Sequence, residues 1–188
     1  SIADNAFGDC SSLINIDVDK DNQTYSSQDG VLFNKDKTVL INYPIGSERT
    51  SYNIPDSVTN IGEYAFADCK NLKSIMVSNS LTHIGEYAFS GCTNLTCVTI
   101  PNSVTSIGEY AFSSCKSLTS VIIPDGVTRI NESTFRECTS LKSIIIGNGV
   151  TVIDRYAFYN CKNLTCVTIP NSVTVIGWYV FDICSSLE

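Results

Sequence analysis

Apolar residues return along the chain at a fixed step of 23 positions. Phenylalanine, cysteine, leucine and valine each keep this step in their own place within the repeat. The phenylalanine column is Phe66, Phe89, Phe112, Phe135, Phe158 and Phe181, and the leucine column is Leu72, Leu95, Leu118, Leu141, Leu164 and Leu187. Several columns locked at one spacing indicate an internal repeat, which decides the fold before any local feature does.

One repeat shows the local pattern. From Leu95 to Ile100 the apolar positions end in an alternation, which predicts a short strand with one buried face. Pro101 and Asn102 then form a corner, because both residue types suit turn conformations. Equivalent strands are expected near residues 15–18, 52–54, 74–77, 97–100, 120–123, 143–146 and 166–169, seven in one parallel sheet.

The second half of each repeat points inward as well. The segment from Val104 to Ile107 is expected to add a weaker second ladder. Ala111, Phe112 and Cys115 are three and four residues apart, a spacing that favours a helical turn with all three on one face. Because one coil cannot bury these side chains alone, neighbouring coils must stack. The period of 23 falls in the range of leucine-rich repeats.

We therefore expect an α/β repeat fold, a right-handed leucine-rich-repeat solenoid. Its parallel β-sheet is expected on the concave face and short helical turns on the convex side. The whole chain, 1–188, is expected to be one domain, with regular repeats from about 54 to 188 and an irregular coil at about 19–54.

The irregular coil is longer than the others. From Val18 to Ile54 the strand column advances by 36 positions, 13 more than the regular step (36 − 23 = 13). Two β-prone runs, Gly30–Phe33 and Thr38–Ile41, flank the polar turn Asn34–Lys37. This pattern predicts a β-hairpin, which we expect to replace the helical turn on the outer side.

The repeat has a specific consensus sequence. The pattern I-P-x-S-V-T-x-I-G-x-Y-A-F-x-x-C-x-x-L runs from Ile100 to Leu118 and recurs from Ile54 and Ile169. It resembles the BspA-like, or treponemal-type, leucine-rich repeat family, and the segment Tyr25–Pro44 matches that family too. The resemblance implies secreted or surface-attached proteins of mucosal bacteria and some parasitic protists, some of them implicated in adhesion to host matrix proteins. The family has no shared catalytic residues to carry over.

Composition narrows the functions further. The net charge of −7 argues against nucleic acid and against an anionic membrane surface, because both require a basic face. No run approaches the roughly 18 apolar residues of a membrane span. No signal or transit peptide is visible at Ser1, but the chain begins and ends within a repeat. We interpret it as a fragment or mature piece of a longer array.

Seven of the nine cysteines share one column, Cys10, Cys69, Cys92, Cys115, Cys138, Cys161 and Cys184. A zinc site would need converging C-x-x-C pairs, which the 23-residue step does not provide. Stacked thiols at about 4.8 Å lie within disulfide range, but parallel side chains would strain the bond. We favour a buried, reduced structural ladder, with disulfides as the alternative. Cys97 and Cys166 belong to a second, outward-facing column.

Other polar columns offer weaker candidates. Glu63, Glu86, Glu109 and Glu132 form either a cation-binding strip or a solvated face, and we favour the latter. A tyrosine column on the outer turn is interpreted as packing. His83 is the single histidine and occupies a variable position, so no catalytic constellation can be built around it. We predict no catalytic residue, no metal and no cofactor.

Strand alternation predicts the binding surface. Val98 and Ile100 point inward, so the side chains between them face out. The candidate binding residues on this concave face are Met76, Cys97, Thr99, Ile122, Ile145, Cys166 and Thr168. Exposed apolar residues in one patch favour a contact site. The alternative is that β-branched residues lie there because strands favour them.

We therefore predict a non-enzymatic domain, extracellular or at the cell surface. It is expected to mediate protein–protein interaction or adhesion, with a host matrix or cell-surface protein as the type of partner. The alternative is a structural spacer, or a solenoid that assembles end to end. A hydrolase or metalloenzyme would need residues that the chain lacks.

Overall fold

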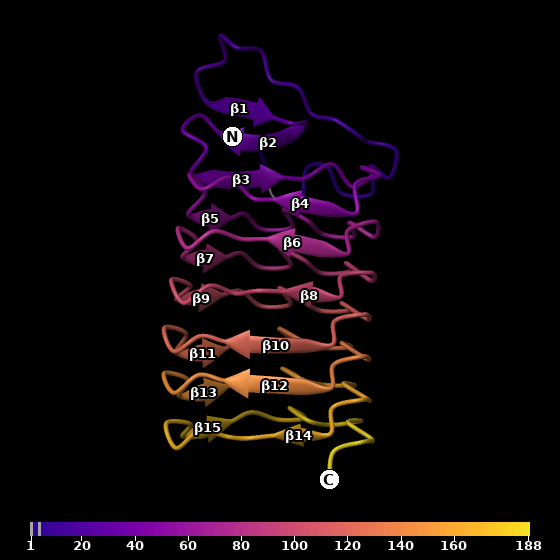
Figure 1. The fold of residues 1–188 in the computed structure, drawn as a ribbon, viewed down its shortest axis with the longest axis vertical. Helices are drawn as coiled ribbons and strands as arrows, with labels where there is room; N and C mark the ends of the chain where they lie inside the picture. The colour runs from indigo at the N-terminus through magenta and orange to yellow at the C-terminus, as the bar shows by residue number, and fades with distance from the viewer. Residues whose placement is uncertain (1, 4) are drawn as a thin grey trace.

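The computed structural model describes residues 2–3 and 5–188, which form a column of stacked coils (Figure 1). Successive coils follow the order of the chain, from the indigo N-terminal end to the yellow C-terminal end. The described residues contain fifteen short strands and no helix. Each regular coil contributes one strand to each of two ladders, which we call the long ladder and the short ladder.

The long ladder lies on one side of the column. Its strands are β4 (Ser51–Asn53), β6 (Ser74–Met76), β8 (Cys97–Val98), β10 (Ser120–Ile123), β12 (Ser143–Ile146) and β14 (Cys166–Val167). All pairings in it are parallel, and each residue pairs with its equivalent in the next coil, as Ile122 does with Ile145. The strands divide into two three-stranded sheets, β4-β6-β8 and β10-β12-β14.

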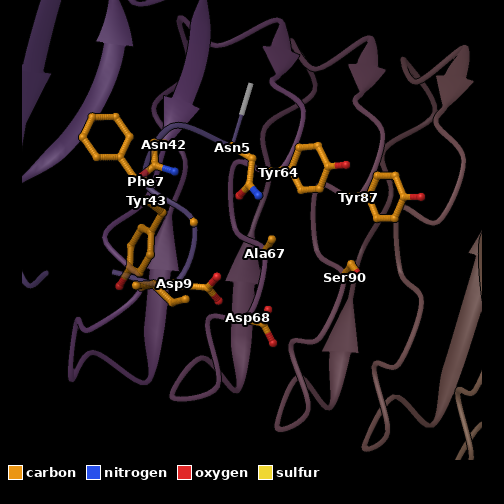
Figure 2. Close-up of a pocket in the computed structure, with 12 residues that line it drawn as sticks. Asn5, Phe7, Asp9, Asn42, Tyr43, Tyr64, Ala67, Asp68, Tyr87 and Ser90 are labelled. Carbon is orange, nitrogen blue, oxygen red and sulfur yellow. The ribbon is translucent and has the colours of Figure 1, made fainter. Parts of the chain in front are cut away.

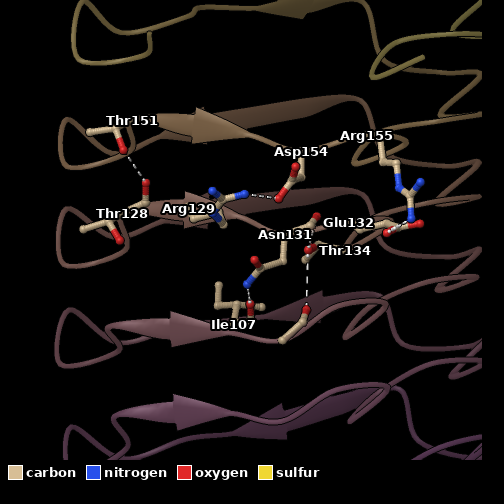
Figure 3. A network of polar contacts seen from close by, with 10 residues as sticks. Ile107, Thr128, Arg129, Asn131, Glu132, Thr134, Thr151, Asp154 and Arg155 are labelled. Atoms are coloured by element: carbon tan, nitrogen blue, oxygen red, sulfur yellow. Dashed lines mark hydrogen bonds and ion pairs between the residues drawn. The ribbon is translucent and has the colours of Figure 1, made fainter. Parts of the chain in front are cut away.

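The short ladder confirms the predicted second ladder. Its two-residue strands are β5 (Asn60–Ile61), β7 (His83–Ile84), β9 (Ser106–Ile107), β11 (Arg129–Ile130), β13 (Val152–Ile153) and β15 (Val175–Ile176). Threonine hydroxyls extend the pairing, as Thr151 Oγ1 donates to the Thr128 carbonyl at 3.1 Å (Figure 3). Side chains thus add hydrogen bonds between coils whose strands are very short.

The irregular coil contains the predicted hairpin in an unexpected place. Strands β2 (Val31–Asn34) and β3 (Val39–Asn42) pair antiparallel, and β1 (Tyr25–Gln28) adds a third strand that was not predicted. Because β3 pairs in parallel with β5, the hairpin extends the short ladder. The expectation that it replaces the outer turn is therefore wrong. Leu40, fully buried and paired with Ile61, holds it in the short-ladder register.

The predicted helical turns are also wrong. In the outer turn, which joins the short ladder to the next long-ladder strand, every second backbone N–H donates to the next coil, as Phe66 does to the Ala88 carbonyl at 2.7 Å. The N–H groups between them bond three residues back, as Cys69 does to Phe66 at 3.1 Å. Tyr64 and Asp68 adopt φ values of 55°, which a right-handed helix does not contain. Hydrogen bonds between coils have replaced those of a helix.

The count of seven strands in one sheet needs a second correction. Residues 15–18 form no strand. Ile16 donates its N–H to the Gly30 carbonyl at 2.9 Å, and Val18 donates its N–H to Ser27 Oγ at 3.0 Å. These bonds tie the segment to the hairpin region instead of to a parallel partner in the next coil.

The core runs the length of the stack. Every phenylalanine from Phe66 to Phe158 in the repeat column is fully buried. Their rings stack with centroids 5.0 to 5.5 Å apart, close to the spacing of the coils. Interior side chains at this density gain contacts only when the neighbouring coil is in place.

Candidate functional site

The outer side of the long ladder exposes every second side chain. In β10, Val121 and Ile123 are 3% and 1% exposed, whereas Ile122 between them is 57% exposed. In β12, Ile145 is 61% exposed beside buried neighbours. This is the alternation expected of a strand with one face in the core.

Two exposed columns result, and they contain all seven candidate binding residues. One column is Ser51, Ser74, Cys97, Ser120, Ser143 and Cys166, and the other is Asn53, Met76, Thr99, Ile122, Ile145 and Thr168. Met76 is 65% exposed, which makes it the most exposed of the three large apolar side chains in this row. Ile122 and Ile145 are paired in adjacent strands, whereas Thr99 separates them from Met76.

The small side chain of Thr99 leaves a cavity of about 440 Å³, which we call the Thr99 notch. Its floor contains Val98 and Ile100, which are largely buried. Asn102 and Ile122 also line it. An apolar floor with a few polar groups at the rim is the usual make-up of a pocket that receives a side chain or small ligand.

The face is electrically neutral along both columns. From Ser51 to Thr168 neither column contains a charged residue. Lysines flank it in the adjacent column, at Lys73 and Lys142, both exposed. Binding here would depend on apolar contact and hydrogen bonding more than on ion pairs.

Cys97 and Cys166 lie in this face as exposed, unpaired thiols. Cys97 pairs across the ladder with Ser74, and Cys166 with Ser143. They are three coils apart and the structure does not bring them together. A serine on the neighbouring strand gives each thiol a polar setting.

The other cysteine column is different. Cys69, Cys92, Cys115, Cys138 and Cys161 are buried, Cys184 is partly buried and Cys10 is exposed, and none of the nine cysteines is in a disulfide. Each buried thiol from Cys92 onward donates to the phenylalanine carbonyl 26 residues earlier, as Cys115 does to Phe89 at 3.2 Å. Burial raises the pKa of the Cys92 and Cys138 thiols to about 12. These thiols therefore pack and cap carbonyl groups in the described structure.

The glutamate column runs along the outer turn. Glu132 forms an ion pair with Arg155 at 2.8 Å (Figure 3). It also accepts a hydrogen bond from the Tyr110 hydroxyl at 3.2 Å. Burial raises the pKa of Glu109, and the carboxylates of Glu132 and Glu86 raise it further. Among residues 2–3 and 5–188, no group of three or more His, Cys, Asp or Glu side chains is placed to hold a metal ion. Nor does this part of the chain form an apolar helix of the length that crosses a bilayer.

One feature was missed by the sequence interpretation. A hollow of about 200 Å³ lies between the N-terminal coil and the outer turn that carries Tyr64 (Figure 2). Asn5, Asp9, Asn42 and Asp68 are among the residues that line it. Its only sequence signal is the irregular length of the coil between these two segments.

Comparisons with known proteins place the chain among bacterial repeat proteins. The model of the BspA type leucine rich repeat region matches residues 45–125 and 105–188, in six copies. Comparison with curated protein sequences gives no match.

Solved structures give the same result. A leucine-rich repeat protein from Eubacterium ventriosum superposes with a TM-score of 0.77 at 30% identity, over 98% of this chain and 55% of that one. A leucine rich cell surface protein from Faecalibacterium prausnitzii gives 0.66 at 33%, over 98% and 43%. A leucine-rich repeat protein from Bacteroides ovatus gives a TM-score of 0.60 at 26% identity, over 90% of this chain and 49% of that one. The chain thus spans about half the length of these proteins, 43% to 55%.

Proposed function

We propose that this chain, which belongs to the BspA-type leucine-rich repeat family as its motif predicted, is a repeat domain that binds a protein partner. The proposed binding surface is the exposed side of the long ladder. The observation that carries the proposal is the row of exposed apolar side chains at Met76, Ile122 and Ile145. Exposed apolar residues gathered on one face are typical of contact sites. Strand propensity accounts for isoleucine at two of these positions but does not account for Met76.

The surface suggests how a partner is held. A solenoid presents an extended face to a long segment of its partner. The two isoleucines offer a paired apolar ridge, and the Thr99 notch offers a place for one side chain of the partner. Because the columns contain no charge, we expect the affinity to change little with ionic strength.

We further propose that the domain acts outside the cell or at its surface, in adhesion to host matrix proteins or host cells. The repeat family and the similarity to a protein named as a leucine rich cell surface protein support this location. The matched part is less than half of that protein, so the surface role is a proposal for this chain.

We assign no catalytic role to this chain. The single histidine, His83, is exposed in the short ladder, and its Nδ1 lies 2.7 Å from the hydroxyl of its neighbour Thr82. A general base needs a nucleophile or substrate group to act on and a third group to orient it. Thr82 offers a hydroxyl to one ring nitrogen of His83, but among the described residues no third group bonds to the other ring nitrogen to orient it.

A structural spacer is the alternative function. The stacking supports it, because within each sheet the regular coils pair in parallel at the same register, with one break in each ladder, between β8 and β10 and between β9 and β11. A spacer needs only its shape and its length. It would therefore keep its function when the exposed apolar row is changed, and this difference separates the two proposals.

The test is the double variant Ile122→Lys with Ile145→Lys. Binding would be measured by surface plasmon resonance on a panel of immobilised extracellular-matrix proteins and by attachment to cultured epithelial cells. We expect the parent to bind at least one target and the double variant to lose about tenfold or more in affinity, because two ammonium groups would be desolvated in the contact.

A matched control is available on the short ladder. Val152 and Val175 are also paired in adjacent strands, so Val152→Lys with Val175→Lys introduces the same charge at the same spacing on another face. This control should keep the parent's affinity. If the folded Ile122/Ile145 variant keeps every interaction of the parent, the row is not the binding site and the spacer function gains support.

A further inference from the structure

The hollow beside Tyr64 results from a shortened outer turn in the irregular coil. In the regular coil, Ile61 of β5 and Ser74 of β6 are 13 positions apart (74 − 61 = 13). Their partners in the irregular coil, Leu40 and Ser51, are 11 apart (51 − 40 = 11). The turn is two residues shorter, so it does not fill the layer between its neighbours.

The column of stacked tyrosine rings ends at the hollow. Tyr64 stacks on Tyr87 at a centroid distance of 4.7 Å and an interplanar angle of 3°, and Tyr87 stacks on Tyr110 in the same way. On its other side Tyr64 makes no ring contact among the described residues and borders the hollow instead. A partly exposed aromatic ring at the edge of a cavity can pack against the apolar face of a ligand.

Polar groups surround the same space. Figure 2 shows the amides of Asn5 and Asn42 on one side of it and the carboxylates of Asp9 and Asp68 on the opposite side. Asn42 Oδ1 is buried and has no hydrogen-bond partner among the residues that the structure describes. Ser90 adds a hydroxyl. Because Asn42 Oδ1 is buried, a ligand in the hollow does not reach it and would meet Asn42 through its amide N–H groups.

The charge of the lining disfavours anionic ligands. Among the described residues, the lining contains two carboxylates and neither lysine nor arginine. Lys70, outside the lining, forms an ion pair with Asp68 at 3.8 Å. Phosphate, sulfate or a carboxylate would still lie close to the like charge of Asp9, which is unfavourable. A neutral or cationic ligand therefore fits the lining better than an anionic one.

Hydrogen-bond chemistry selects between these two. An ammonium group only donates, so it would leave the amide N–H groups of Asn5 and Asn42 without an acceptor. A hydroxyl both donates and accepts, so neighbouring hydroxyls can bond to carboxylates and amides at once. A pyranose ring also presents a C–H face that can pack on Tyr64. The volume of about 200 Å³ suits one such ring and is below the range for drug-sized ligands.

We propose that this hollow binds one neutral saccharide unit, with Asp9, Asp68 and Asn42 bonding its hydroxyls and Tyr64 packing on its ring. The site is separate from the long-ladder face and does not depend on the proposed protein-binding function. It gives the domain a second, chemically different contact at its N-terminal end.

Saturation-transfer NMR on the intact chain tests the proposal. The probes are the methyl glycosides of glucose, galactose, mannose and N-acetylglucosamine, with glucuronate and ethylammonium as charged comparisons. We expect saturation transfer to at least one neutral glycoside, with the millimolar affinity typical of a single sugar, and none to glucuronate. Stronger binding of ethylammonium than of every glycoside would overturn the assignment of a saccharide.

Variants locate the binding. Asp68→Asn and Asn42→Ala should each lower the affinity by about tenfold, whereas Glu137→Gln should leave it unchanged. Glu137 occupies the column of Asp68 three coils later (137 − 68 = 69) and lies outside the hollow, so it controls for loss of a carboxylate on the outer turn. Asp68→Asn replaces an exposed carboxylate by an amide of the same shape and tests the site even if Asn42→Ala fails to fold. Absence of saturation transfer to all four glycosides, or transfer unchanged in Asp68→Asn, would refute the site.

Discussion

The phenylalanine column and the exposed column of the long ladder follow the same 23-residue step but differ in how much they vary. The first is phenylalanine at every coil from Phe66 to Phe181. The second reads Asn53, Met76, Thr99, Ile122, Ile145 and Thr168. A side chain stacked between two equivalents must match both in shape, whereas an exposed side chain has no such partner. The comparison indicates that the buried columns provide most of the stability. The exposed columns can vary from coil to coil and so can determine which partner is bound.

The largest effect on the free energy of unfolding is expected from a substitution that creates a cavity in the interior. Phe112 is fully buried, and its ring lies 5.1 Å from that of Phe89 and 5.4 Å from that of Phe135. Phe112→Ala should lower the free energy of unfolding by roughly 3–5 kcal/mol, because it removes contacts with two coils at once. Chemical denaturation monitored by circular dichroism measures the change.

The control for this variant lies in the same coil. Glu109 is exposed, and Glu109→Ala should change the free energy of unfolding by no more than about 0.5 kcal/mol. Equal losses in the two variants would show that the division into inner and outer columns is wrong.

The second test raises the pH to ionise two buried thiols, which removes a proton from each without removing any heavy atom from the core. Burial raises the pKa of Cys92 and of Cys138 from an ordinary value of 9.0 to about 12, so the folded protein holds these protons more tightly than the unfolded chain. Their contribution is complete below pH 9 and is lost as the pH rises towards 12. Each thiol should lower the free energy of unfolding by about 1.4 kcal/mol per pH unit in the middle of this window and by less near its two ends.

Urea denaturation between pH 9 and pH 10, with a reductant present, measures this slope. Tyrosines titrate in the same range, so the double variant Cys92→Ala with Cys138→Ala provides the reference. Over this pH unit the parent should lose about 2 kcal/mol more of its unfolding free energy than the double variant, since two thiols ionise in the unfolded chain and not in the folded protein. Identical slopes would mean that the thiols are not protected by burial.

The sequence predicts most of this architecture because stacking requires the same type of side chain at the same position of each coil. The 23-residue step places Phe112 and Cys115 inside and Ile122 outside, and the structure agrees on all three. The same spacing suggested a helix, because residues three and four apart share a face in a helix and also in this outer turn. Spacing within one coil cannot show that N–H groups such as that of Phe66 bond to the next coil.

The hollow escaped prediction for a different reason. The sequence shows that the irregular coil has 13 extra residues, but it does not show how they are distributed. The outer turn between Leu40 and Ser51 loses two residues, so the hairpin side must gain 15 (15 − 2 = 13). Only the strand register separates these two changes. The residues around the hollow therefore have no common spacing by which the sequence could identify them.

A third test concerns the place where the short ladder is interrupted, between β9 and β11. Gly85 and Gly108 each donate a backbone N–H to the preceding coil at this position, to Ile61 and Ile84 respectively. At Asn131 the side chain takes over, because its Nδ2 donates to the Ile107 carbonyl at 2.6 Å (Figure 3). Asn131→Asp keeps the shape but cannot donate, so it should cost roughly 1–3 kcal/mol of unfolding free energy.

Asn131→Gly distinguishes the side-chain bond from the ladder itself. If the backbone N–H can take the place of the amide, as it does at Gly108, the glycine variant should be more stable than Asn131→Asp in the same denaturation experiment. A loss in Asn131→Gly as large as in Asn131→Asp would show that the amide bond is required at this interruption.

The smallest effect on stability should come from filling the Thr99 notch. Thr99 is exposed and already β-branched, so Thr99→Ile should change the free energy of unfolding by less than about 0.5 kcal/mol. If a partner inserts a side chain into the notch, the same change should lower its affinity by about tenfold, because the site is then occupied. Thr168→Ile makes the identical substitution three coils later in the same column and should leave binding unchanged. Full affinity in Thr99→Ile, together with loss of binding in the Ile122/Ile145 lysine variant, would show that the partner lies along the apolar row without entering the notch.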